Sequence, residues 1–310
     1  MSNWKDDGVG LDARVRVAAF AFLKTKAELH GDVLPRAILA EGFQFESNRV
    51  PLLGPQGIFK PAVLPDMPLS ITTVPAVEGR DRPYDDVIDY DGLLRYRYRG
   101  TDPSHRDNVG LRLAMKQHVP LVYLHGIVPG EYLPVWPVYV VGDDPTSLSF
   151  LVEVDASQLV GVPPACDEAV AVPRRYAGRI VQHRLHQAGF RTRVLHAYEE
   201  RCAVCRLRHS ELLEAAHILP DTHPKGEPIV PNGLALCGLH HAAFDGYVLG
   251  IQPDLTVQIR EDVLTEEDGP VLRHGLQGFQ GSRIHVPRRE ALRPNREFLA
   301  ERFDLFRKAG

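Results

Sequence analysis

The chain has 310 residues, of which 44% are hydrophobic and 25% charged, and its formal net charge is −4. This length can bury two cores, and the composition is that of a soluble globular protein. The sequence lacks the run of roughly 18–20 apolar residues that a membrane span needs, which argues against a membrane partner. The polar, acidic start MSNWKDDGVG is not typical of a signal peptide.

Charge is unevenly distributed along the chain. Residues 1–170 carry 16 Lys and Arg against 23 Asp and Glu, whereas residues 171–310 carry 20 against 17. Nine arginines and two glutamates lie within 174–208. A local basic stripe can bind phosphate even when the net charge is negative, although a solvated helix face would have the same composition.

Hydrophobic periodicity predicts an α+β chain. A helix is expected over 12–30, followed from Leu52 to about Asp155 by short strands broken by Pro, Gly and Asp, with a helix at 107–116 between them. The strand-like runs are LSITTV, LLRYRYR, PLVYLHGI, WPVYVV and LSFLVEVD. We expect a first domain at 1–160, a linker at 161–175 and a second domain at 176–310.

The second half of the chain has a different pattern. A basic helix is predicted from about Tyr176 to Tyr198, then a short strand containing AAHI and a short helix starting near Leu239. The tail adds two strand-like runs, VQIRE and RIHVP, and a final amphipathic helix at 296–306.

Two short cysteine motifs predict a zinc site. Among the four cysteines of the chain, Cys202-x-x-Cys205 is followed by Cys237-x-x-His240. Without an export signal, this spacing favours a metal over a disulfide. The four residues match the closed tetrahedral ligand set of a structural Zn²⁺, which would stabilise a small domain without doing chemistry. The alternative is a pair of buried free cysteines at chance spacing.

A second set of polar residues, His217, Asn232, His241 and Asp245, is interleaved with these ligands. His217 lies in the strand-like run LLEAAHIL, and Asn232 lies in a loop before GLALC. His241 and Asp245 are four residues apart, so on a helix they share a face and can hold one divalent cation. A single histidine on an apolar strand is usually just packed, and the interleaving is what favours a site.

The segments EAAHILP, PNGLALC and HHAAFD resemble the three blocks of the HNH (ββα-metal) endonuclease motif. The resemblance implies that His217 is the general base that activates water and that Asn232 fixes its orientation. It also implies that His241 is catalytic and binds a divalent metal, Mg²⁺ or Mn²⁺, together with Asp245. His240 takes a zinc position that is often a cysteine in the family.

The sequence departs from the family pattern at Ala216, where many HNH enzymes have an Asp or His that binds the metal. Glu214 is two residues earlier, so on a strand it points to the same face and could replace that ligand. Alternatively, His241, Asp245, the phosphate and water complete the metal shell.

The stretch from Tyr84 to Gly100 suggests a reader of modified DNA. Period-two alternation in LLRYRYR puts Tyr96 and Tyr98 on one face and three arginines on the other, as in any amphipathic strand. With its acidic neighbours, the stretch resembles the SRA (SET- and RING-associated, or YDG) domain, a β-barrel with flanking helices that flips modified cytosine out of DNA. The resemblance implies that Tyr84 and Tyr98 stack on the base, with Tyr96 as the alternative, and that Asp86 accepts from the cytosine N4 amino group.

Other parts of the first half fit such a reader only loosely. The segment 54–64 could form a loop at a pocket or groove, and the polar residues of the predicted helix at 107–116 and its start could contact phosphate: Arg106, Asn108, Arg112 and Lys116. The alternative is another small β-barrel or sandwich of unrelated use.

Together these features predict a modification-dependent DNA restriction endonuclease in the cytoplasm of a prokaryote. The expected partner is double-stranded DNA carrying 5-methyl- or 5-hydroxymethylcytosine. Because duplex scission needs two cuts, we expect a homodimer or paired action on one DNA. One alternative keeps the nuclease but changes its target to unmodified, glucosylated or phosphorothioate DNA. The other is a non-catalytic, zinc-stabilised DNA-binding protein.

Overall fold

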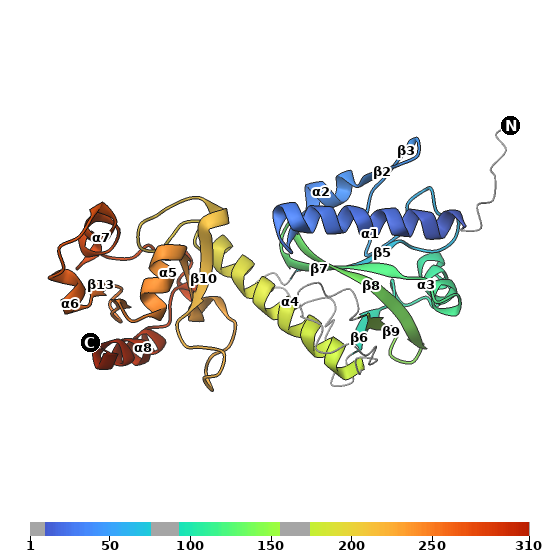
Figure 1. The fold of residues 1–310 in the computed structure, drawn as a ribbon. Helices are drawn as coiled ribbons and strands as arrows, with labels where there is room; N and C mark the ends of the chain where they lie inside the picture. Colours follow the sequence, from blue (N-terminus) through green and yellow to red (C-terminus); the bar gives the residue numbers. More distant parts are fainter. Residues whose placement is uncertain (1–9, 76–92, 156–173, 310) are drawn as a thin grey trace, which may run out of the picture. The chain divides into compact units, whose positions relative to one another are not determined.

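The computed structural model describes residues 10–75, 93–155 and 174–309, and it divides into two compact units, Met1–Ala188 and Gly189–Gly310 (Figure 1). The division falls within helix α4 (Arg174–Ala197), because Leu185 packs in the first core and Phe190 in the second. The expected linker at 161–175 lies almost wholly outside the described residues, so its role stays a prediction. In the described part of the chain, no helix is long and apolar enough to cross a membrane.

The first unit is built on a curled, mostly antiparallel sheet. Within the described residues it has seven strands in the order β4-β5-β7-β8-β9-β6, with β1 added on β8, and β5 and β7 are parallel. The bounds are β1 Leu34–Pro35, β4 Ile58–Phe59, β5 Ser70–Thr73, β6 Leu94–Arg97, β7 Leu121–Val128, β8 Glu131–Asp144 and β9 Ser149–Val154. Whether this sheet is an SRA-like barrel stays a prediction.

Strand β7 is buried on both faces, which explains its continuous apolar run. Val122 and Leu124 face the core that is shared with α1 (Leu11–His30). Leu121 and Tyr123 face the other core, which is closed by α3 (Arg106–Lys116). The sheet therefore separates two hydrophobic layers. Helices α1 and α3 each begin one residue before the start that the sequence predicts.

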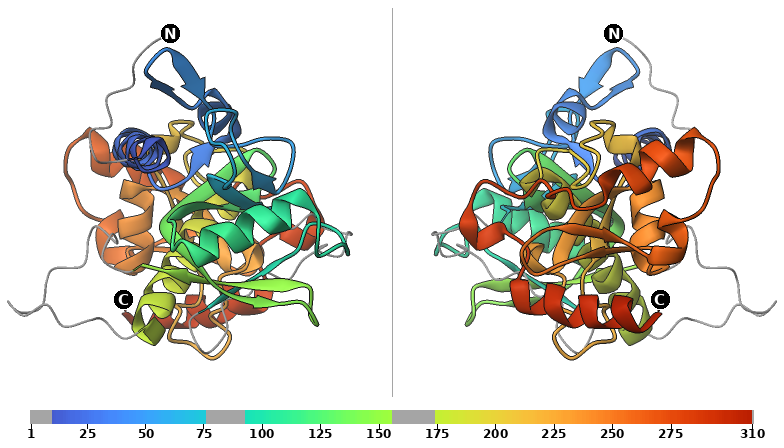
Figure 2. Two further views of the ribbon diagram at one scale, coloured as in Figure 1. Left: turned by 90° about the vertical axis from the view of Figure 1, so that its right-hand side faces the viewer. Right: turned by 90° about the vertical axis from the view of Figure 1, so that its left-hand side faces the viewer.

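The segment between strands β1 and β4 contains small elements that the sequence does not predict. They are α2 (Arg36–Glu41) and a hairpin of β2 (Phe43–Phe45) and β3 (Asn48–Val50). The hairpin projects beyond α1 and α2 (Figure 2). Its strands are too short for periodicity to reveal them.

The second unit consists of short elements around one core. They are β10 (Leu213–His217), β11 (Gly233–Cys237), α5 (Gly238–Asp245), β12 (Leu249–Ile251), β13 (Val257–Ile259), α6 (Glu261–Leu264), α7 (Pro270–Gly275) and α8 (Arg296–Ala309). β10 pairs with β11 and β12 with β13, in two antiparallel hairpins. The predicted strand RIHVP is wrong, because this segment forms only an isolated bridge between Arg283 and Thr256.

Candidate active site and metal centre

Three cysteines and one histidine converge beside the β10–β11 hairpin. The ligand atoms of Cys202, Cys205, Cys237 and His240 all lie within 4.8 Å of one another. Three thiols and one imidazole are a donor set suited to a tetrahedral zinc ion. The cluster can therefore hold a metal such as zinc, as the spacing predicts, although the identity of the ion stays a prediction.

The imidazole of His240 is already oriented for this role. Its Nε2 lies 2.9 Å from the carbonyl oxygen of Gly275, which can only accept, so Nε2 carries the proton. That leaves Nδ1 as the metal-facing atom, and it lies 3.1 Å from the sulfur of Cys237 and 3.6 Å from that of Cys202. A backbone carbonyl behind a metal-binding histidine is a common orienting partner.

The hairpin and helix α5 bring the predicted HNH residues together. His217 ends β10 and pairs in register with Gly233 at the start of β11. Any Cβ at Gly233 would lie 2.4 Å from the Val194 side chain and 2.9 Å from the ring of Phe190, so α4 packs directly on this end of the hairpin. Because α5 follows β11 without a loop, its His241 is carried to the same place.

His217 is held by stacking rather than by hydrogen bonds. Its ring lies 4.0 Å from that of Phe190, centroid to centroid, with an interplanar angle of 14°. The Oδ1 of Asp221 lies 3.0 Å from Nε2 but outside hydrogen-bonding geometry, so this buried nitrogen lacks a hydrogen-bond partner among the described residues. Because a carboxylate oxygen faces this nitrogen, a proton, a water molecule or a cation between the two groups would satisfy both.

The pKa of His217 is lowered. Desolvation is the largest cause, and the positive charge of a protonated His241 lowers it further, whereas the carboxylates of Asp221 and Asp245 raise it. Helix α5, which carries His241 and Asp245, contacts strand β10, which carries His217. The imidazole is therefore neutral at pH 7, which is the form that can accept a proton.

Asn232 ties down the loop that follows β10. Its Oδ1 accepts from the backbone N–H of Leu219 at 2.9 Å, and its Nδ2 donates to the carbonyls of Leu219 and Glu227 at 2.9 and 3.1 Å. These hydrogen bonds go to the backbone rather than to the His217 ring. Asn232 therefore acts on the histidine through the chain two residues beyond it.

His241 lies between two carboxylates. Its Nδ1 donates a hydrogen bond to Oε2 of Glu214, and its Nε2 lies 3.2 Å from Oδ2 of Asp245. With the proton on Nδ1, a nitrogen lone pair faces a carboxylate oxygen, and the two repel unless a cation lies between them. The pair formed by His241 and Asp245 thus fits a proton or a divalent metal ion. Glu214 therefore contacts the Nδ1 side of the His241 ring, opposite the Nε2 atom that faces Asp245.

Three residues at the site carried no signal in the sequence. Phe190 looks like any apolar residue of an amphipathic helix, and Asp221 like any loop acid. Arg302 lies on α8, and its Nη2 is 3.5 Å from Oδ1 of Asp245. Their contacts join segments far apart in the chain, which no local spacing encodes. The nearby arginine stripe is partly structural, since Arg191 donates to the carbonyls of Ser210 and Leu213 at 3.2 and 2.9 Å.

The predicted base pocket is only partly within the described structure. Tyr84 and Asp86 lie outside the described residues. Tyr96 lies on the buried face of β6 and Tyr98 directly follows the strand, and only 6% and 2% of their surfaces are exposed, as the alternation predicts. The Tyr98 hydroxyl donates to Asp143, and its ring packs on Phe150 at 4.6 Å. Their role in base stacking stays a prediction.

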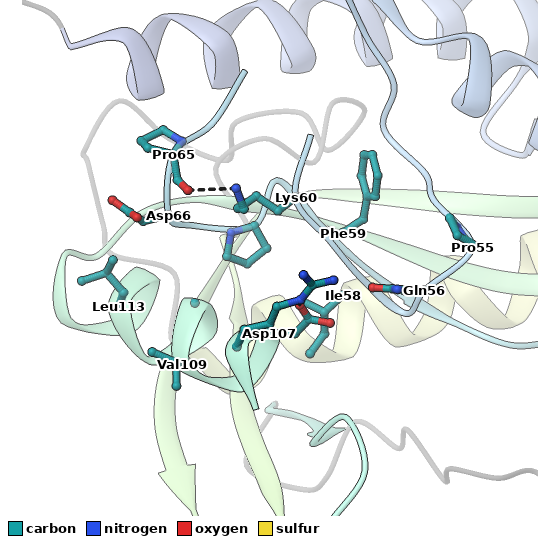
Figure 3. A pocket seen from close by; sticks show the side chains of 13 residues that line it. Pro55, Gln56, Ile58, Phe59, Lys60, Pro65, Asp66, Asp107, Val109 and Leu113 are labelled. Atoms are coloured by element: carbon teal, nitrogen blue, oxygen red, sulfur yellow. Dashed lines mark hydrogen bonds and ion pairs between the residues drawn. The ribbon is translucent and has the colours of Figure 1, made fainter. Parts of the chain in front are cut away.

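A pocket of about 700 Å³ opens in the first unit between the loop at 55–60 and helix α3 (Figure 3). Its walls are mainly apolar, and Lys60 spans one side by donating to the carbonyl oxygens of Leu64 and Pro65 at 2.9 and 2.8 Å. The structure thus brings the predicted loop 54–64 next to Arg106 on α3. Arg112, by contrast, pairs internally with Asp143 at 2.7 Å.

The chain was compared with known proteins. The family model described as HNH endonuclease matches residues 202–252. No curated protein matches the chain. The chain is similar to a solved structure titled "Modification dependent TagI restriction endonuclease", with 18% sequence identity, a TM-score of 0.29 and coverage of 77% of this chain and 82% of that chain.

The family match coincides with the geometry. Residues 202–252 include all four members of the cysteine–histidine cluster, the β10–β11 hairpin and helix α5. This segment is an HNH endonuclease domain, and the chain that contains it is an endodeoxyribonuclease.

Proposed function

We propose that the protein is a modification-dependent DNA restriction endonuclease that recognises a modified cytosine by base flipping and hydrolyses the DNA backbone in its HNH domain. One observation supports the cutting step above all others. Nε2 of His217 makes no hydrogen bond in the described part of the chain and faces Asp221, and strand β10, which carries it, packs against helix α5, which carries the His241–Asp245 pair.

His217 acts as the general base. Its neutral ring takes a proton from water as the water attacks phosphorus, and a positioned base typically accelerates such a step by 10²–10⁴. Stacking on Phe190 restricts rotation of the ring, so Nε2 keeps its direction. Asn232 fixes the backbone that leaves the strand.

His241 and Asp245 hold a divalent ion, Mg²⁺ or Mn²⁺, which when bound stabilises negative charge on the phosphate and on the leaving oxygen. Glu214 keeps the proton on Nδ1 of His241, so that Nε2 stays available as the ligand atom. In this role Glu214 orients a ligand and does not itself take the place left by Ala216.

The reader is proposed from the sequence of the first unit. Tyr84 and Tyr98 stack on the flipped base, with Tyr96 as the alternative ring, and Asp86 accepts from N4 of cytosine. Aromatic stacking offsets the few kcal/mol that unstacking costs. Discrimination of 5-methyl- or 5-hydroxymethylcytosine then depends on pocket shape. Cutting both strands requires a homodimer or two molecules on one DNA.

A digestion panel tests the proposal. Matched plasmids carrying cytosine, 5-methylcytosine, 5-hydroxymethylcytosine or glucosylated cytosine are incubated with Mg²⁺ or Mn²⁺, using the wild type and His217→Ala. We expect cutting of methylated or hydroxymethylated DNA by the wild type alone, while His217→Ala still binds the DNA.

The panel separates the rival functions. Equal cutting by the wild type and His217→Ala would show that His217 is not the general base. If unmodified or glucosylated plasmids were cut as efficiently as methylated ones, the target would be one of these other DNA classes. Binding without cutting under every condition would identify a non-catalytic DNA-binding protein.

A further inference from the structure

Arg302 is a buried cation that lies against the metal-site helix but comes from outside the HNH-matched segment. It lies on α8, beyond the matched residues 202–252, and only 9% of its surface is exposed. Its Nη2 donates to the carbonyl of Phe244 at 3.0 Å and lies 3.5 Å from Oδ1 of Asp245. Its Nη1 donates to the hydroxyl of Tyr247 at 3.1 Å.

Aromatic rings fix the guanidinium in this position. Its central carbon lies 4.7 Å from the ring centroid of Phe244 and 4.4 Å from that of Tyr247. Stacked and forked contacts of this kind suit the planar, always charged guanidinium and cannot be reproduced by lysine. The side chain is too enclosed to reach out to a DNA phosphate, so its positive charge acts inside the domain.

The carboxylate of Asp245 is shared between two directions. Oδ1 faces Arg302, and Oδ2 faces Nε2 of His241. Asp245 is also the last residue of α5, where the carbonyls of the final turn carry partial negative charge. A cation at this end stabilises the helix terminus, and its charge favours the rotamer in which Oδ1 of the 59% exposed Asp245 side chain faces Arg302.

We infer that Arg302 is a positioning residue for the HNH site: it holds Asp245 so that Oδ2 points to the metal side, and α8 is therefore a functional part of the nuclease. This inference rests on the proposed function. It predicts that the catalytic metal ion is bound less tightly when the fork of Arg302 is removed, even though Arg302 does not touch the ion.

Binding of Mn²⁺ measures this directly. In a zinc-loaded His217→Ala background, saturated with a modified duplex that this variant does not cut, free Mn²⁺ is titrated by electron paramagnetic resonance. We expect Arg302→Met to raise the dissociation constant for Mn²⁺ about tenfold, as is typical when an outer-shell partner of a metal ligand is lost. Arg302→Lys should weaken binding in the same direction by a smaller factor.

A matched control lies next to it on the same helix. Glu301 forms a half-buried ion pair with His223 at 2.8 Å and is not an ion-pair partner of Asp245, so Glu301→Gln should leave Mn²⁺ affinity unchanged. Wild-type Mn²⁺ affinity in a folded Arg302→Met, or in Arg302→Lys where the methionine variant does not fold, would overturn the inference. If the His217→Ala background itself bound no Mn²⁺ and the wild type cut no DNA, the proposed function would fail instead.

Discussion

At the scale of single residues, His217 is balanced between burial, which lowers its pKa below 6.5, and the carboxylates of Asp221 and Asp245, which raise it. A general base works only when deprotonated, so cleavage should be constant at pH 7–8 and decline below pH 6.5 as the ring gains a proton. Asp221→Asn removes one of the charges that raise the pKa. The decline should therefore shift to lower pH in this variant.

Single-turnover cleavage at saturating metal gives the required profile, because it separates the chemical step from metal loss and product release. Asp304→Asn, a change at an exposed acid on α8, serves as the matched control and should leave the profile where it is. A decline centred above pH 7, or a shift to higher pH in Asp221→Asn, would contradict the role given to His217.

The spacing of residues predicted most of the metal-binding and catalytic side chains, but not the residues that pack against them. Cys202-x-x-Cys205 and Cys237-x-x-His240 fix which side chains can meet around one ion, and the fold brings them together. The interval between His241 and Asp245 is one helical turn, so their contact follows from helix geometry. The stacking of Phe190 and the ion pair of Arg302 depend on tertiary packing, which periodicity does not contain.

At the scale of elements, we expect the hairpin and α5 to depend on a metal ion in the cysteine–histidine cluster for stability. Cys202 is fully buried, and the strands of the second unit are only three to five residues long. Structural zinc contributes about 10–16 kcal/mol in small zinc-finger peptides, so loss of one ligand should destabilise this unit strongly. Cys202→Ser should therefore lower the zinc content and the unfolding temperature.

Elemental analysis and calorimetry check this expectation, with one zinc per chain expected in the wild type. Cys166→Ser is the matched control, because that cysteine belongs to neither Cys-x-x-Cys/His motif, and it should keep both the zinc and the unfolding temperature. If the wild type contained no zinc and a chelator left its melting transition unchanged, the prediction of a structural zinc ion would be wrong.

Elements with strong periodicity were predictable from the sequence, and short or irregular ones were not. The predicted helix at 12–30 is α1, and the basic helix from Tyr176 is α4, which starts two residues earlier. RIHVP alternates like a strand but forms only one bridge, because the backbone N–H groups of Ile284 and His285 donate to two different segments, at Leu255 and Ala203. Pairing partners decide whether an extended segment becomes a strand, and they are a tertiary property.

At the scale of the whole molecule, recognition and cutting should be separable, because they are assigned to different compact units. Asp86→Ala removes the carboxylate proposed to accept from cytosine N4. We expect this variant to lose its preference for modified over unmodified duplexes while keeping the zinc content and metal affinity of the wild type. Tyr98 is less suited to this test, because its ring also packs in the core and its loss would change both the fold and the proposed stacking.

Asp66→Ala makes the comparison decisive, because Asp66 lines the pocket between the 55–60 loop and α3 (Figure 3). Binding of paired modified and unmodified duplexes is measured for both variants by fluorescence anisotropy, with metal omitted so that nothing is cut. The proposed reader predicts loss of discrimination in Asp86→Ala and wild-type discrimination in Asp66→Ala. The reverse result would assign base recognition to that pocket, and retained discrimination in both variants would place the reader at neither site.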